Sequence, residues 1–230
     1  MDKPFQCVSV GYLITKPTPR PGHLSKEEFP EKIFSASKDV AQFFPDEWAI
    51  PWSRMDEQQR RHRAHAFGIN NEQRAAVTAW CRERFSVEYG WPNVIFSLDT
   101  ARSLKAQYLR DNEDVAILGV GLHRSLARDF GRIGPPPRQE PGFAPVGKSG
   151  IYEAFLRGAE IEDGTPLGFE LIEYRQGFAR TWLCSEEFDR SAGVNKYGLI
   201  DDFDEAMRRI GRLSQSSIKQ WLPWLLVSCG

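Results

Sequence analysis

Apolar and polar residues alternate along residues 5–14, and this rhythm predicts a first strand. Val8, Val10, Tyr12 and Ile14 recur at every second position, so we expect them to share one apolar face. Residues 115–120 form an apolar run without charge, which is typical of a buried strand. That run is expected to lead through Gly121 into a helix, whose apolar positions are Leu122, Leu126 and Phe130.

Spacings of three and four residues predict helices between these strands. Asn71 is expected to cap a helix of about 15 residues, and its apolar stripe consists of Val77, Trp80, Cys81 and Phe85. A second helix should begin near Ser97 or Asp99 and end at Leu109. Ser37 is expected to cap a shorter helix that runs through Phe43 and Phe44 and stops at Pro45.

The second half of the chain follows a Pro- and Gly-rich break. Residues 131–150 contain five Pro and five Gly, which is typical of a linker or a long exposed loop. Beyond it, a short helix is expected over 151–156, and a hairpin over 167–172 and 178–184. Asp202 and Glu205 match a capping box that opens a further helix. The last strand, 221–227, contains Pro223 and is therefore expected at a sheet edge or bulge.

Strands and helices in no strict alternation indicate an α+β fold, with a mainly antiparallel sheet packed with several helices. The 230 residues suit a single domain with a long Pro/Gly-rich loop near 131–150. A division into 1–130 and 150–230 around that loop is the alternative.

Composition narrows the class of protein. No apolar run approaches the roughly 20 residues that span a bilayer, and no signal peptide is visible, so we expect a cytoplasmic protein without a membrane partner. The four cysteines stand far apart and form no C-x-x-C pair, which favours reduced, mostly buried thiols; Cys229, next to the end, could be exposed.

Net charge is −1, but acidic residues are concentrated in one region. Residues 151–210 carry thirteen Asp or Glu against seven Lys or Arg. Such a stretch could steer a basic partner or simply be solvated. The near-neutral total argues against a protein that coats nucleic-acid phosphates.

Two motifs have ordinary structural explanations beside their chemical ones. Gly119-Val-Gly121 resembles part of a dinucleotide loop, but Arg124 replaces the third glycine, and a tight strand-to-helix turn explains it as well. His62 and His65 are three residues apart, so on a helix their imidazoles could bind one metal ion. The flanking Arg60, Arg61 and Arg63 favour a solvated basic helix face instead. That basic run could also contact RNA or DNA phosphates, although one run is a weak footprint. No metal or cofactor is expected.

His123 is the best candidate for a general base, because it follows a buried strand. Ser125, Cys184 or a carboxylate could serve with it as the second reacting group. No nucleophile elbow or papain-like context is present, and a structural histidine is the alternative.

Two groups of carboxylates form the candidate partner-binding residues: Glu186, Glu187 and Asp189, and then Asp201, Asp202 and Asp204. Helix capping and the helix dipole explain Asp202, Asp204 and Glu205. The first group has no such role, so it offers a surface for Arg and Lys of a partner, unless it pairs internally with Arg180 or Arg190.

Residues of about 150–230 resemble bacterial cytosolic immunity-type proteins encoded beside polymorphic toxins. The resemblance lies in Gly168-Phe-Glu-Leu171, Thr181-Trp-Leu-Cys184, Asn195-Lys-Tyr-Gly-Leu-Ile200 and the final Trp-Leu-Pro-Trp, while Ser185 stands where Asn is expected. It covers about a third of the chain and includes no catalytic motif. It implies a binding protein whose partner is a cognate toxin, and a basic toxin would fit the acidic stretch.

The leading hypothesis is therefore a cytosolic inhibitor that binds a cognate toxin without catalysis. A small hydrolase or transferase using His123 with a carboxylate or Cys184 is the second hypothesis. A nucleic-acid accessory protein using Arg60 to Arg63 is the third.

Overall fold

The computed structural model describes residues 6–24, 26–37, 42–43, 48, 57–84, 89–90, 94–109, 112–126, 160–161, 163–175, 178–184, 193–216 and 221–230. The break predicted at 131–150 and the helix predicted at 151–156 lie outside these residues.

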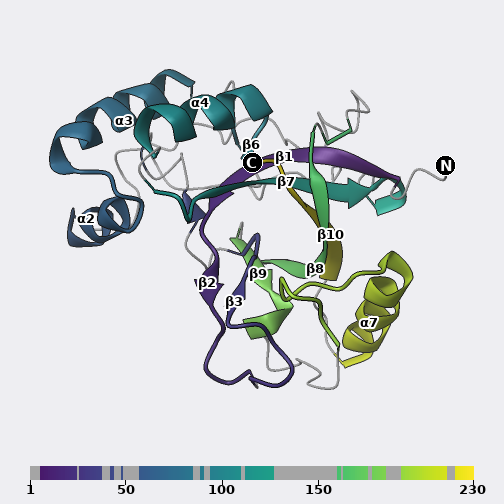
Figure 1. Cartoon of the computed structure of the whole chain (residues 1–230). Helices are drawn as coiled ribbons and strands as arrows, with labels where there is room; N and C mark the ends of the chain where they lie inside the picture. The colour runs from purple at the N-terminus through teal and green to yellow at the C-terminus, as the bar shows by residue number, and fades with distance from the viewer. Residues whose placement is uncertain are drawn as a thin grey trace.

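Four long antiparallel strands form the centre of the main sheet. In spatial order they are β1 (Cys7–Thr15), β7 (Ala116–His123), β10 (Trp221–Ser228) and β8 (Thr165–Arg175). In Figure 1, β1 and β7 run across the molecule, whereas β8 and β10 turn downward toward its lower half.

Shorter strands extend this sheet at both sides. β9 (Phe178–Thr181) pairs with β8, as the predicted hairpin requires. On the other side, β4 (Gln42–Phe43) and β6 (Val94–Ile95) pair with β1, and β5 (Tyr89–Gly90) pairs with β6. A separate pair is formed by β2 (Thr18–Pro19) and β3 (Lys32–Ile33).

The helices place side chains in one apolar cluster, called here the helix-side cluster. Within the described residues, these helices are α2 (Glu57–Ala66), α3 (Asn71–Arg84), α4 (Leu98–Tyr108) and α7 (Phe203–Ser216). Figure 1 shows α3 and α4 beside the β1 end of the sheet and α7 beside the β8 end. The α+β class with a mainly antiparallel sheet and several helices is confirmed.

The main sheet is apolar on both faces, and two bulges decide which side chains lie on which face. Val8 and Val10 belong to a second cluster, whereas Tyr12 and Ile14 belong to the helix-side cluster. The prediction that these four share one face is wrong, because the β1–β7 register shifts between Ser9 and Gly11. One extra residue in a strand reverses the alternation beyond it.

A second bulge occurs in β8. Its register with β10 shifts opposite the step from Leu226 to Val227, so Leu167 lies in the second cluster while Phe169 and Leu171 lie in the helix-side cluster. A glycine with positive φ follows each extra residue, Gly11 at +147° and Gly168 at +136°. Glycine adopts such angles without strain.

Some local predictions failed because pairing in the sheet outweighs local signals. Gln42 and Phe43 form strand β4, not the end of a helix, and Phe43 pairs with Ile14 and stacks on Trp48 at 5.6 Å between ring centroids. Leu122 belongs to β7 and not to a helix, because it pairs with Val8.

The remaining corrections concern single residues. The cap of α3 is Asn70, one residue earlier than predicted: Gln73 N donates to Asn70 Oδ1 at 2.8 Å, and Asn70 N donates to Gln73 Oε1 at 3.0 Å. Strand β10 lies inside the sheet, and Pro223 stands just before the stretch that pairs with β7. Cys229 is buried, with Cys7 and Cys81.

The four segments that carry the resemblance meet directly, and Thr181 of the second is hydrogen-bonded to the Glu170 side chain of the first. Glu170 of the first pairs across the sheet with Trp224 of the fourth. Phe169 N donates to Ile200 O at 2.6 Å, and Ile200 N donates to Phe169 O at 2.9 Å, which joins the first segment to the third. These segments therefore form one structural unit, from which α7 begins.

Candidate functional site

The acidic residues at the start of α7 form the part of the predicted partner surface that the structure describes. Asp201, Asp202 and Asp204 are all exposed. The first predicted group, Glu186, Glu187 and Asp189, lies outside the described residues, so the expected convergence of the two groups stays a prediction.

Asp202 caps α7, as the sequence predicts. Glu205 N donates to Asp202 Oδ1 at 2.8 Å, and Ala206 N donates to the Asp202 carbonyl at 3.0 Å. This contact satisfies a helix N–H group that would otherwise lack an intrahelical partner. The position of the Asp202 carboxylate is therefore set by the helix.

Glu205 faces along the helix and pairs with three arginines. Arg209 Nε donates to Glu205 Oε1 at 2.7 Å, Arg208 also pairs with the carboxylate, and Arg212 lies 3.6 Å from Oε1. The hydrogen bond from Arg209, with the charges of the three guanidiniums, holds the pKa of Glu205 below its ordinary value. Glu205 is thus engaged within α7.

Asp201 is held by Asn195, which is the centre of a local hydrogen-bond network. Asn195 Nδ2 donates to Asp201 Oδ1 at 2.6 Å and to the Leu167 carbonyl of β8 at 2.7 Å. Asn195 Oδ1 accepts from Tyr197 N at 2.9 Å and from Leu199 N at 3.2 Å. One side chain therefore ties the turn, the sheet and the Asp201 carboxylate together.

The buried Arg209 fastens the same turn to α7 from the other side. Its side chain is 9% exposed, and Nη2 donates to the Gly193 carbonyl at 3.1 Å. The guanidinium lies 5.4 Å from the centroid of the Trp182 ring, within the range of a cation–π contact. Residues on both sides of Asp201 are therefore anchored to the fold.

His123 lies next to this acidic surface, a proximity that the sequence did not predict. The imidazole stacks on Phe203, the first residue of α7, with 4.6 Å between ring centroids and 23° between planes. Phe203 in turn lies 5.5 Å from the Phe169 ring. The end of β7 and the start of α7 thus meet through aromatic rings.

The polar contacts of His123 are local. Ser125 Oγ lies 2.7 Å from His123 Nδ1, and Ser125 N donates to the same nitrogen at 3.3 Å. Such contacts between residues two apart begin the helical turn over 124–126. The pair has the reach of a nucleophile and base.

Cys184, the other suggested partner of His123, ends the 3₁₀ turn Trp182–Cys184, which follows β9. In the order of the sheet, β10 and β8 stand between β9 and β7. The side chain of Cys184 lies outside the description, so its pairing with His123 stays a prediction.

The glycines of the suspected nucleotide loop lie inside strand β7. A Cβ at Gly119 would stand 2.6 Å from Ile161 Cγ2, and one at Gly121 would stand 2.9 Å from Ile161 Cδ1. The two glycines make room for the Ile161 side chain. Both a phosphate loop and a strand-to-helix turn are thereby excluded.

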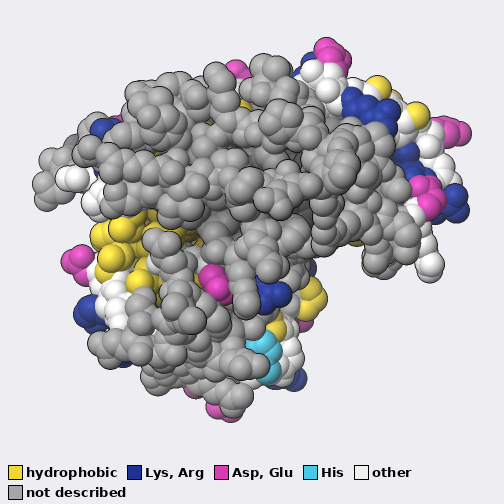
Figure 2. Space-filling view, turned by 180° about the vertical axis from the view of Figure 1, so that it is seen from behind, with side chains coloured by type: hydrophobic (Ala, Val, Ile, Leu, Met, Phe, Trp, Pro, Cys, Tyr) yellow, Lys and Arg dark blue, Asp and Glu magenta, His cyan; other side chains and the backbone are white. Residues whose placement is uncertain are grey.

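The basic surface lies on α2 and α3, and ion pairs offset part of its charge. Glu57 Oε1 pairs with Arg74 at 2.8 Å and with Arg61 at 3.2 Å. Figure 2 shows Lys and Arg side chains gathered at the end of the molecule that carries α3 and α4. A shallow hollow of about 440 Å³ lies there, lined by Asn71, Arg74, Ala75, Thr78, Ala79 and Arg82.

The two histidines considered as metal ligands lie on α2. His62 and His65 both belong to α2; His65 is exposed, and the side chain of His62 is outside the description. No group of three or more His, Cys, Asp or Glu in the described ranges is arranged to hold a metal ion. Among the same residues, no helix is both long and apolar enough to cross a bilayer.

Comparison of the chain with protein-family models, with curated proteins and with solved structures finds no match.

Proposed function

We propose that this chain is a cytoplasmic immunity-type inhibitor that binds and neutralises a cognate bacterial toxin without catalysis. The observation that carries the proposal is the exposed acidic start of α7, Asp201, Asp202 and Asp204, on a turn held by Asn195 and the sheet. The partner surface would extend to Glu186, Glu187 and Asp189.

The hydrogen bonds within this surface favour binding. A carboxylate accepts about four hydrogen bonds, so the bonds from Asn195 to Asp201 and from Glu205 N to Asp202 leave capacity for a partner's Arg or Lys. Groups that are already positioned lose less conformational entropy when they bind. Phe203 and His123 add an aromatic element beside the charges, as in interfaces where aromatic anchors lie within a polar rim.

Co-purification tests this proposal. The chain would be expressed with the toxin domain encoded by the gene beside its own, with the tag on the toxin. We expect a complex that survives gel filtration at micromolar concentration, and the absence of any complex would refute the proposal. A chain with Asp201, Asp202 and Asp204 changed to Lys serves as the site control and should give less complex at low salt.

A second candidate, a small hydrolase or transferase, is favoured by the 2.7 Å contact between His123 Nδ1 and Ser125 Oγ. Ester substrates with a chromophoric leaving group test it. Turnover that His123→Ala and Ser125→Ala both abolish would support the enzyme, whereas equal rates for parent and both variants would refute it.

A further inference from the structure

Glu170 has a fully buried side-chain carboxyl group. It lies on β8 and is 0% exposed. The Ser35 hydroxyl donates to Glu170 Oε1, and Ala36 N donates to Glu170 Oε2 at 2.7 Å. Ser37 N donates to Ser35 Oγ at 2.9 Å, which continues the chain of hydrogen bonds.

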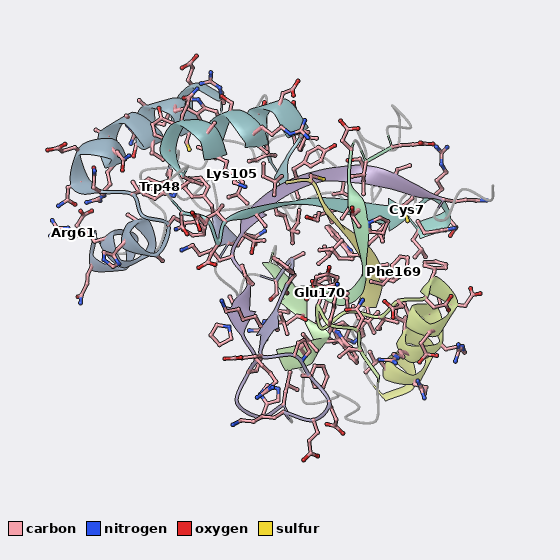
Figure 3. All side chains as sticks on the ribbon, in the orientation of Figure 1. Cys7, Trp48, Arg61, Lys105, Phe169 and Glu170 are labelled. Atoms are coloured by element: carbon pink, nitrogen blue, oxygen red, sulfur yellow. The ribbon has the colours of Figure 1, made fainter. Side chains whose placement is uncertain are left out.

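The surroundings of this carboxyl group are apolar. Glu170 is the cross-strand partner of Trp224 in the neighbouring strand β10, and Ile172, Trp224 and Ala36 belong to the second cluster. Figure 3 shows Phe169 beside α7, and the next residue, Glu170, extends to the other side of β8 toward residues 33–37.

Among the described residues of the elements packed against Glu170, the charged groups lie elsewhere. Glu173 of β8 and Arg180 of β9 are cross-strand partners, and alternation along β8 puts Glu173 on the opposite face. The phenol of Tyr197 is half-buried, and three further groups are exposed: Lys32, Lys196 and Asp201. No cation in this set pairs with the Glu170 carboxyl group.

Burial raises the pKa of Glu170 to about 7, although the hydrogen bonds from Ser35, Ala36 and Thr181 favour the ionised form. The carboxyl group is therefore largely neutral in mildly acidic solution. A neutral carboxyl group can donate its O–H to Ser35 Oγ and still accept a hydrogen bond from Ala36 N.

The segment that Glu170 holds is also attached to the turn before α7. Phe34 N donates to the Tyr197 carbonyl at 3.2 Å, and a Cβ at Gly198 would stand 2.8 Å from Ile33 Cγ2. Residues 33–37 thus contact both β8 and the turn that precedes Asp201. A change in their attachment would reach both elements.

We propose that Glu170, Ser35 and the Ala36 amide form a proton-operated clasp, which holds residues 33–37 on β8 while the carboxyl group is neutral and weakens as it ionises. This inference does not depend on the proposed function.

The direction of the pH effect follows from linkage. An open clasp exposes Glu170 to water, where its pKa returns to the ordinary 4.5, whereas the closed clasp holds it at about 7. The opening constant is therefore lowest below about pH 4.5 and rises by up to about tenfold per pH unit between the two pKa values. Above about pH 7 it no longer changes with pH. Between pH 5.5 and pH 8 the opening constant should rise about 25-fold.

Hydrogen exchange of the Ala36 amide measures this opening, after correction for the intrinsic rate. In the parent chain we expect the opening constant to rise about 25-fold between pH 5.5 and pH 8. In Glu170→Gln it should not change with pH, because glutamine has nearly the same shape but does not ionise. Glu173→Gln is the matched control, because it neutralises a buried glutamate on the opposite face and should keep the parent profile. A Glu170→Gln profile equal to the parent's would overturn the clasp, as would a flat profile in Glu173→Gln.

Titration of the Glu170 side-chain carbon by NMR keeps the test decisive if Glu170→Gln does not fold. We expect a midpoint near 7 in the parent chain. Ser35→Ala should move it upward, because it removes a bond that favours the ionised form. A parent midpoint near the ordinary value, or a Ser35→Ala midpoint that does not rise, would refute the proposal.

Discussion

Phe169 and Ile200 form a reciprocal pair of backbone hydrogen bonds, at 2.6 Å and 2.9 Å, between strand β8 and the turn before α7. These bonds occupy the flank of β8 that the short strand β9 does not reach. They determine where α7 starts relative to the sheet. The exposed aspartates at that start therefore have a defined position on the molecule.

Replacing Gly168 by Ala should loosen this junction. A Cβ there would stand 2.8 Å from Leu199 Cβ and 2.9 Å from the Ile200 carbonyl oxygen, and φ is +136°. Backbone strain and overpacking each cost about 1–3 kcal/mol. We therefore expect the free energy of unfolding, measured by urea denaturation, to fall by about 2–4 kcal/mol.

Gly211→Ala is the matched control for that change. Gly211 lies in α7, and its Cβ would meet nothing within 4 Å. Alanine should therefore raise stability by about 0.5–1 kcal/mol through its helix propensity. Equal effects of the two substitutions would contradict the close approach at Gly168.

Asn195→Asp tests the network that holds Asp201. Aspartate keeps the acceptor for Tyr197 N and Leu199 N, but it replaces the donor to Asp201 and to the Leu167 carbonyl with an oxygen. Stability near neutral pH should fall by about 2–3 kcal/mol, since the part-buried Leu167 carbonyl then lacks its donor and two carboxylates meet. Protonation should restore part of the loss below about pH 4. A variant as stable as the parent at both pH values would show that the network contributes nothing.

Asp202→Ala should cost about 1 kcal/mol of stability, because it removes the cap from Glu205 N. Asp204→Ala serves as the comparison, since Asp204 is exposed in the first turn of the same helix and, within the described part of the chain, interacts with the helix dipole alone. Thermal unfolding of both variants measures the difference. An equal loss would mean that Asp202 acts through its charge alone.

Changing Glu186, Glu187 and Asp189 together to Lys tests the rest of the proposed partner surface. Surface substitutions usually alter stability by less than about 0.5 kcal/mol each, so the variant should fold. Its association with a basic toxin should be slower, and the difference should shrink as salt rises. Stopped-flow mixing at two salt concentrations measures both effects.

The same charge change made elsewhere is the control. Glu72, Glu113 and Asp114 are exposed on α3 and before β7, at a distance from α7 in the fold. Their change to Lys should slow association much less. If both triple variants slow it equally, net charge and not a specific surface controls the rate, and unfolding of the first variant would show that its carboxylates pair internally.

Much of the fold could be predicted from apolar periodicity. Strands β1, β7 and β8 and helices α3, α4 and α7 all follow from it, because burial of one face or stripe is a local pattern. The bulges at Val10 and Leu167 could not be placed, since the need to bury both faces of the sheet arises only from the assembled layers. Gly11 and Gly168, standing inside strand patterns, were their only signals in the sequence.

The candidate site was predictable only in part. The capping role of Asp202 has a sequence signature, and it was found. The contact of His123 with Phe203 and the bond of Asn195 to Asp201 depend on where β7 and α7 meet, and no spacing in the chain encodes that. Glu170 was counted as one acidic residue among thirteen, although burial makes it unlike the others.

The most direct measurement of the central claim is a titration of toxin activity. The toxin domain proposed as the partner would be held at a fixed concentration well above the dissociation constant, and its activity followed as the purified chain is added. An inhibitor that acts by binding predicts a linear fall that ends at one equivalent, with full activity recovered when the complex is dissociated. Activity that persists beyond several equivalents would contradict the claim, and so would loss of activity at a small fraction of one equivalent, because that would require turnover.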